Sequence, residues 1–256
     1  MQKAILLICL LGIINPVKGA EKHTKTAFEN AVKKLALKDV QAQMTLETTD
    51  TGGSSILRKL NVSFGCFEKA RKVMIEITAP EDLKGTQILT THFTDKSRKD
   101  IIEVFLPSTK KIRKFRANNR NLKIPGTEIP MSHFSSTAFD DYLISEEEKD
   151  NFNGREVQKI KLQLPGNAEY LVIYLDVQAE LLYRINSFDN KDNLTSNTEF
   201  TDYRHPEFYT SENHFPYKVH VYNPTSGKTS ELTITKLSQL TQIRDYDFEL
   251  AKNLQP

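Results

Sequence analysis

The fold class is decided by the stretch Val73-Met74-Ile75-Glu76-Ile77-Thr78, in which valine and isoleucine occupy every second position. A period of two places successive side chains on opposite faces of a β-strand. The stretch therefore predicts a strand with one buried face and one wetter face. The same period recurs at 60–64, 160–164 and 217–221, so we predict a mainly β protein.

Short turn signals separate the predicted strands. They are Thr51-Gly52-Gly53, Asn153-Gly154, Pro165-Gly166-Asn167, Asp189-Asn190 and Pro224-Thr225-Ser226-Gly227. Strands joined by such short turns pair antiparallel, because parallel strands need long crossover connections. The strands should therefore form a meandering antiparallel sheet.

One segment after the N-terminal region has helical spacing, from about Ala27 to Lys38. Its apolar residues Phe28, Ala31, Val32 and Leu35 fall on one face of a helix. Thr26 and Glu29 match a capping box, which predicts that the helix begins there. We expect this helix to pack one face onto the sheet.

The N-terminus has the pattern of a cleaved signal peptide. Lys3 precedes the apolar run 4–14, which is too short to cross a bilayer core that needs roughly 20 residues. We expect cleavage after Gly19, so that 1–19 is the signal peptide and 20–256 is a single domain. An exported protein of the periplasm is predicted.

Charge and cysteine content argue against a nucleic-acid-binding protein and against a protein stabilised by disulfides. The chain has 35 Lys and Arg against 33 Asp and Glu, and cleavage would remove Lys3 and Lys18 and balance the charges. A neutral balance gives no reason to propose nucleic acid as a partner. Cleavage would also leave Cys66 as the one cysteine, so the mature chain could form no internal disulfide.

Residues suited to catalysis or metal binding are scattered. The histidines lack the spacing of a metal site; they are His23, His92, His133, His205, His214 and His220. The apolar setting of Cys66 should raise its pKa and make the thiol inert. Asp140, Asp141 and the run 146–148 suit capping or ion pairing better than acid–base chemistry. We predict no metal, no cofactor and no enzymatic activity.

The strongest concentration of charge is basic. It consists of Lys110, Lys111, Arg113, Lys114 and Arg116, with Ile112 and Phe115 between them. Such a run can contact anionic headgroups or an acidic partner. It can equally be an exposed sheet edge on which cations prevent aggregation. The acidic residues 146–150 are candidates to pair with part of it.

A long irregular segment, 118–149, combines Pro125, Gly126 and Pro130 with apolar residues. Loops of this length without regular structure are uncommon in a compact domain and usually functional. The runs 101–106 and 171–175 are apolar on both faces, which indicates strands covered on both sides. The long segment is the candidate cover.

Three blocks resemble the LolA-like outer-membrane lipoprotein-sorting proteins. At 74–89, MIEITAPEDLKGTQIL is similar to the family's strand, proline turn, lysine-glycine pair and second strand. At 103–115, EVFLPSTKKIRKF resembles its strand-proline-basic hairpin, and at 135–143, SSTAFDDYL occupies the place of its Phe-Ser-Tyr-Glu-Asp-Leu stretch. One departure is the run 130–133, where the family commonly has glycine followed by an acidic residue.

The resemblance implies a strongly curved antiparallel sheet, a half-open barrel, with an N-terminal helix and a helix or loop lid over an apolar cavity. It implies a monomeric periplasmic carrier or chaperone for acyl chains of lipids or lipoproteins, in traffic towards the outer membrane. The alternative is an accessory subunit or sensor that binds a membrane transporter or envelope protein through the basic run.

We expect alternating apolar residues to line the cavity, unless they only fill a dry core; these are Ile75, Ile77, Leu89, Val104, Leu106, Ile173 and Leu175. The lid residues that we expect are Met131, Phe134, Phe139 and Tyr142.

Overall fold

The computed structural model describes residues 17–35, 37–95, 97–116, 123–124, 126–130, 139–209 and 214–251. Its elements are α1 (Val17–Leu35), β1 (Val40–Thr49), β2 (Ser55–Cys66), β3 (Ala70–Ala79), β4 (Gln87–Phe93), β5 (Ile101–Leu106), β6 (Lys111–Arg116), β7 (Leu143–Phe152), β8 (Arg155–Gln163), β9 (Tyr170–Asp176), β10 (Leu181–Phe188), β11 (Leu194–Arg204), β12 (Phe215–Asn223), β13 (Lys228–Gln239) and the short 3-10 helix η2 (Asp245–Asp247). Of the expected signal peptide 1–19, residues 1–16 lie outside the described part of the chain, and 17–19 belong to the first turn of α1.

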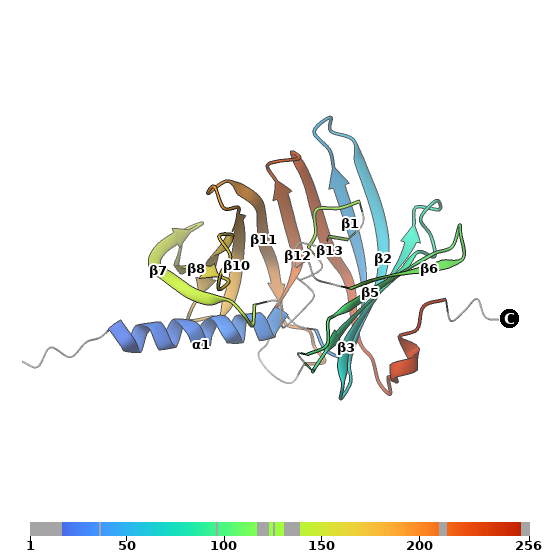
Figure 1. Ribbon diagram of the computed structural model, residues 1–256, viewed down its shortest axis with the longest axis horizontal. Helices are drawn as coiled ribbons and strands as arrows, with labels where there is room; N and C mark the ends of the chain where they lie inside the picture. Colours follow the sequence, from blue (N-terminus) through green and yellow to red (C-terminus); the bar gives the residue numbers. More distant parts are fainter. Residues whose placement is uncertain are drawn as a thin grey trace, which may run out of the picture.

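The strands within the described residues form one curved, open antiparallel sheet (Figure 1). Its order is β6-β5-β4-β3-β2-β1-β13-β12-β11-β10-β9-β8-β7, so two meanders meet where β1 pairs with β13. β6 and β7 are the two edges. The predicted mainly β class and the curved antiparallel sheet are confirmed.

The strands follow from the alternation and the hairpins from their turns. In β1 the buried residues are Val40, Ala42, Met44, Leu46 and Thr48, at every second position. The predicted turn at Asn153-Gly154 joins β7 to β8, and both residues have positive φ, 53° and 81°. That backbone conformation suits Asn-Gly and matches the twist of a two-residue hairpin.

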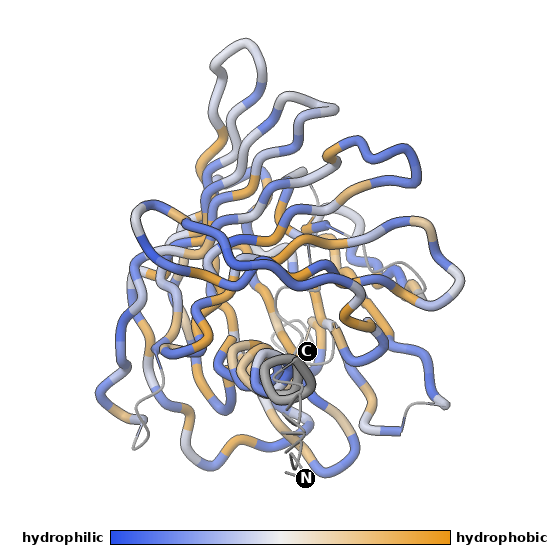
Figure 2. The backbone as a smooth tube through the Cα atoms, turned by 90° about the vertical axis from the view of Figure 1, so that its left-hand side faces the viewer, coloured by the Kyte–Doolittle hydropathy of each residue, from blue (hydrophilic) through white to orange (hydrophobic). Residues whose placement is uncertain are grey.

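The helix α1 begins earlier than the capping box predicts. It runs from Val17 to Leu35, so Thr26 and Glu29 lie inside it and the expected span 27–38 is wrong at both ends. Good helix formers such as Ala20, Glu21 and Lys22 extend it towards the N-terminus. Figure 2, which looks along the helix, shows the sheet curling around it.

The apolar core on the concave face of the sheet has two parts. The first packs α1 against β8–β11, and Ala27, Phe28, Ala31 and Val32 are the buried helix residues. The second lies on β1–β5, β12 and β13, beneath Ile124 and Ile129. Val219 packs against both parts, so they share one face of one sheet.

The C-terminal segment covers part of the opposite, outer face. The ring of Phe248 lies 5.5 Å from that of Phe67, and Asp245 forms an ion pair with Lys72 at 3.1 Å. Gly65 is required beneath it, because a Cβ atom there would approach the Phe248 ring to 2.7 Å. No helix among the described residues is long and apolar enough to span a membrane.

Candidate functional site: an apolar cleft on the concave face

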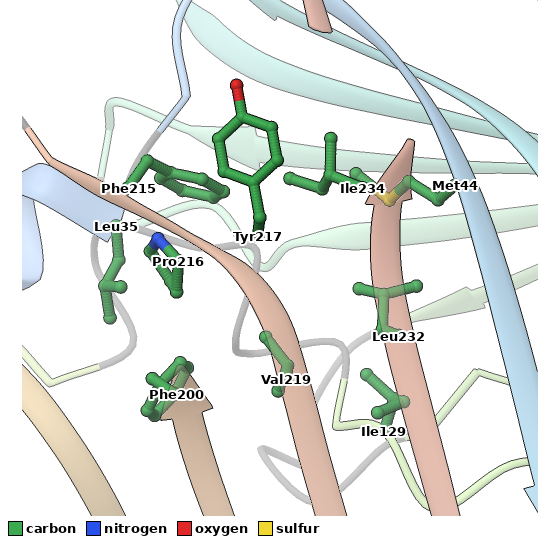
Figure 3. A pocket seen from close by; sticks show the side chains of 10 residues that line it. All are labelled: Leu35, Met44, Ile129, Phe200, Phe215, Pro216, Tyr217, Val219, Leu232 and Ile234. Carbon is green, nitrogen blue, oxygen red and sulfur yellow. The ribbon is translucent and has the colours of Figure 1, made fainter. Parts of the chain in front are cut away.

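An apolar cleft lies on the concave face where the two parts of the core meet (Figure 3). Ten side chains from the end of α1, the loop 123–130 and strands β1, β11, β12 and β13 line it. They are Leu35, Met44, Ile129, Phe200, Phe215, Pro216, Tyr217, Val219, Leu232 and Ile234. Such a lining suits the apolar part of a ligand.

The register of the sheet brings these side chains together. Phe200 is paired with Val219, and Val219 with Leu232, so these three residues form a row across β11, β12 and β13. Ile234 is paired with Met44 across the β13·β1 junction. The cleft therefore depends on the pairing of β1 with β13, the first and last strands along the sequence.

The cleft is narrow in this conformation. It holds about 420 Å³ of empty space when its open side is included, but the cavity itself is about 30 Å³. By the same measure, a cavity needs roughly 10–15 Å³ to hold one water molecule. An acyl chain would therefore have to displace some of the lining side chains.

The loop 123–130 covers part of the concave face, and its residues Ile124, Thr127, Glu128 and Ile129 are buried. Ile124 and Ile129 point into the core and are joined by a 3.0 Å hydrogen bond from Ile124 N–H to the Ile129 carbonyl. The hydroxyl of Thr127 donates to the Ile124 carbonyl at 2.9 Å. Gly126 has a positive φ of 74° between them, which allows the chain to reverse within a few residues.

Glu128 anchors this loop to the β12–β13 hairpin. Its carboxylate accepts hydrogen bonds from Lys123, from Asn223 at 2.8 Å and from Ser226 at 3.3 Å. Its backbone N–H donates to Ser230 Oγ at 2.9 Å. Burial by itself would raise the pKa of Glu128, but the donors outweigh it and the pKa lies below its usual range.

Arg58 lies in the same cross-strand row as the cleft. It is paired with Leu46, which is paired with Leu232 of the lining. Only 5% of Arg58 is exposed, and within the described residues its Nε and Nη1 atoms have no hydrogen-bond partner. Burial lowers the pKa of Arg58, and the charge of Asp82 only partly opposes this.

None of the seven predicted cavity residues lines the cleft. Ile75, Ile77 and Val104 belong to the part of the core under the loop, and Leu106 is half-buried at the end of β5. The two others on the concave face, Ile173 and Leu175, are fully buried in the part of the core that packs under α1.

Leu89 lies on the other face of the sheet. The register pairs it with Met74 and Glu103, whereas Ile88 beside it faces the core. Its side chain is buried, but on the side where the C-terminal segment packs. The prediction that Leu89 faces the concave side of the sheet is therefore corrected.

The predicted lid is only partly described. Met131 and Phe134 lie outside the described residues. Phe139 and Tyr142 pack against the helix part of the core, and the rings of Phe139 and Phe28 meet edge to face at 5.8 Å. The segment also ends earlier than predicted, because β7 begins at Leu143.

The basic run forms the β6 edge and the turn before it. Lys110, Lys111, Arg113 and Lys114 are exposed, and Arg116 ends the strand. Lys114 pairs with Glu103 at 3.3 Å. Two of the acidic residues expected to pair with this run, Glu146 and Glu148, instead contact Lys161 and Lys159 of β8 at the opposite edge of the sheet.

The histidines and the cysteine form no centre among the residues that the structure describes. The rings of His205 and His214 lie 6.1 Å apart, but no cluster of three or more potential metal ligands occurs in that part of the chain. Burial raises the pKa of Cys66, and the charge of Asp39 adds to this. The predicted direction of the Cys66 pKa is confirmed.

Sequence reasoning missed the cleft and Arg58. The alternation at 217–221 had identified Tyr217 and Val219 as one face of a strand, but not which neighbours they meet. Arg58 has the same parity as Leu60, Val62 and Phe64 of β2, all of which are buried. That parity was a signal for a buried arginine.

Comparisons with known proteins identify the family and the fold. Residues 69–254 match a protein-family model described as "Uncharacterized protein". No curated protein sequence matches the chain.

Solved structures share the fold at low sequence identity. A domain from Vibrio parahaemolyticus described as an outer membrane lipoprotein-sorting protein domain is 22% identical, with a TM-score of 0.76 over 92% of this chain and 98% of that one. A DUF1329 family protein from Desulfovibrio piger is 17% identical, with a TM-score of 0.73 over 88% and 97%. A LolA superfamily protein from Nitrosomonas europaea is 14% identical, with a TM-score of 0.64 over 88% and 97%.

The fold that the resemblance implied is confirmed by these structures. The chain belongs to the family whose model matches residues 69–254, and its fold is that of the LolA-like proteins.

Proposed function

We propose that this member of the matched family is a periplasmic carrier or chaperone that holds acyl chains of a lipid or lipoprotein in the concave cleft. The observation that carries the proposal is the cleft itself, whose lining is apolar apart from the tyrosine hydroxyl of Tyr217. Similarity to a lipoprotein-sorting domain and to a LolA superfamily protein supports the class of ligand. The proposal includes export, a monomeric state and no enzymatic activity.

The lining suggests how the cleft admits a chain. Eight of its ten residues belong to sheet strands, whereas Leu35 ends α1 and Ile129 belongs to the loop 123–130. Movement of Leu35 or Ile129 would widen the cleft without breaking a strand pair. Each methylene group that enters gains about 0.8 kcal/mol, which offsets the cost of opening over a few carbons.

Ligand loading tests the proposal. Native mass spectrometry of the protein after mild extraction should show a copurifying lipid or lipoprotein, and delipidated protein should take up a fluorescent fatty acid. Val219→Trp should reduce uptake because its larger ring fills the cleft. Tyr222→Trp is the control, because Tyr222 is exposed on the same strand. Equal uptake by both variants would contradict the assignment of the cleft.

A second function, binding a membrane transporter or envelope protein through β6, is favoured by a separate observation. The edge strand exposes Ile112 and Phe115, at 51% and 48%, among its cations. As an edge strand, β6 also leaves one side of its backbone without a neighbouring strand among the described residues, so a partner strand could pair there.

Neutralising Lys110, Lys111, Arg113 and Lys114 together separates the two functions. Site-specific photo-crosslinking from Phe115 in cells would report on contact with a protein partner. Loss of the crosslink with fatty-acid uptake intact would favour the partner-binding function. Loss of fatty-acid uptake with the crosslink retained would count against the partner-binding function.

A further inference from the structure

Arg58 is a buried cation whose charge the described residues leave unmatched. Its Nε and Nη1 atoms are buried without a hydrogen-bond partner there, although only 5% of the residue is exposed. Burying a charge without a partner is costly, and an unsatisfied buried group needs an explanation such as a missing ion or ligand. An anionic ligand would supply both the opposite charge and the missing hydrogen-bond acceptors.

The nearby carboxylates do not fill this role. Glu128 is occupied by Lys123, Asn223 and Ser226. Asp82 is exposed and influences Arg58 only through its charge.

A second arginine shows the ordinary arrangement. Arg184 also has an unpartnered Nε, but it forms an ion pair with Glu199 and lies over the rings of Phe152 and Tyr174. Arg58 has neither kind of compensation among the described residues. Arg184 therefore has its counter-charge within the protein, whereas Arg58 can still bind one from a ligand.

Two independent features connect Arg58 to the cleft. Arg58, Leu46, Leu232 and Val219 form one row across four neighbouring strands. With strands about 4.8 Å apart, Arg58 lies roughly 10 Å from Leu232. The loop 123–130 also reaches both places, since Ile129 lines the cleft and a Cβ atom on Gly126 would lie 2.9 Å from Arg58 Nη2.

We infer that Arg58 binds the anionic group, a carboxylate or a phosphate, of an amphiphile whose apolar chain occupies the cleft. The inference rests on the proposed function and narrows its ligand to acidic amphiphiles. A guanidinium stays charged and offers several N–H donors in a plane that matches carboxylate and phosphate oxygens. The span from Arg58 to the cleft is within the length of a fatty acyl chain.

The test compares chains that differ only in the head. Delipidated protein is titrated with palmitate, palmitoyl lysophosphatidate and neutral monopalmitin, each displacing a neutral naphthylamine dye. Wild-type protein should bind both acidic ligands at least about tenfold more tightly than the neutral one, as expected for charge-assisted hydrogen bonds. Preference between palmitate and lysophosphatidate identifies the anionic group.

Two variants locate the effect. Arg58→Met should reduce binding of the acidic ligands to the level of monopalmitin and leave monopalmitin unchanged. Lys59→Met is the matched control, because it removes the same charge from the next residue, which is exposed. It should preserve the preference for acidic ligands.

The inference and the proposed function fail separately. Equal binding of acidic and neutral chains by wild-type protein would overturn the role of Arg58 and leave the carrier function standing. Failure of wild-type protein to bind any of the chains would overturn both. If Arg58→Met did not fold, the wild-type comparison would still decide, and Arg58→Lys, which keeps the charge but loses the planar set of donors, should show a smaller preference for the acidic ligands than wild-type protein.

Discussion

The two halves of the concave face differ in the element that packs on them: α1 covers β8–β11, and the loop 123–130 covers part of the other half. Under α1, a continuous apolar stripe lies on β8–β11, and Ile160, Leu162, Ile173 and Leu175 are completely buried. On the other half, the short loop 123–130 covers the strands with Ile124 and Ile129 and satisfies its own polar groups through Glu128 and Thr127. A helix can close a core, whereas this loop leaves a cleft beside it and a buried arginine beneath it.

The largest expected effect comes from truncating the same residue type in each half. Ile173→Ala should cost near the upper end of about 2–5 kcal/mol, because its surroundings are fully packed. Ile234→Ala should cost near the lower end, because Ile234 already borders free space. Urea denaturation would measure both. Equal costs, or the reverse order, would contradict the difference between the halves.

Removing the anchor of the loop should have the next largest effect. Glu128→Ala should destabilise the protein by about 1–3 kcal/mol at neutral pH, because it leaves Lys123 and Asn223 without their acceptor. Glu231→Ala is a suitable control, since Glu231 forms a half-exposed pair with Lys218. Comparable losses from both substitutions would show that the loop is not anchored through Glu128.

The contribution of Glu128 should depend on pH in a defined direction. The folded state lowers its pKa, so its stabilisation is complete above the ordinary glutamate pKa of about 4.3 and is lost as the pH falls through the folded value. The stability difference between wild-type protein and Glu128→Ala should therefore shrink in acid. Thermal unfolding from pH 7 to pH 3 would measure it. A difference that grew in acid would exclude this role.

Arg58→Met should stabilise the protein, in contrast to the substitutions above. Without ligand, replacing an unmatched buried cation by an apolar side chain of similar length should raise stability by about 1 kcal/mol. Thermal unfolding of delipidated protein would detect the change, with Lys59→Met as the neutral comparison. A marked loss of stability would mean that Arg58 already has an anionic partner within the protein.

The smallest effects are expected at the two sheet edges. Lys114→Gln on β6 and Glu146→Gln on β7 each remove one partner of an exposed ion pair, and each should change stability by less than about 1 kcal/mol. Chemical denaturation would measure both. A larger loss at either edge would show that the edges, and not the concave face, determine stability.

The sequence was sufficient to predict the strands but not their cover. The alternation at Ile75 and Ile77 predicts which face of the strand is buried, and Asn153-Gly154 predicts a hairpin. Both predictions succeed because strand alternation and turn type depend on residues close together in the sequence. The predicted start of α1 was wrong because Thr26 and Glu29 match the pattern of a capping box although they lie within a run of good helix formers.

The location of the cleft could not be predicted, because it depends on long-range register. Met44 meets Ile234 only through the β1·β13 pairing, and Ile129 reaches Leu232 only through the path of its loop. Leu89 was misassigned because both Ile88 and Leu89 are apolar, so periodicity alone did not indicate which of them faces the core.

The pairing of β1 with β13 has a consequence for the order of folding. Val40 contacts Gln239, nearly the whole described chain away, whereas every other strand pair joins neighbours in sequence. Contacts between distant residues carry the largest loop-closure cost and slow folding. We expect the two meanders to form first and this seam last, which pulsed hydrogen exchange would show as late protection of β1 and β13. Since Met44, Leu232 and Ile234 lie on the seam, a newly made chain would form the cleft only at the final step of its folding.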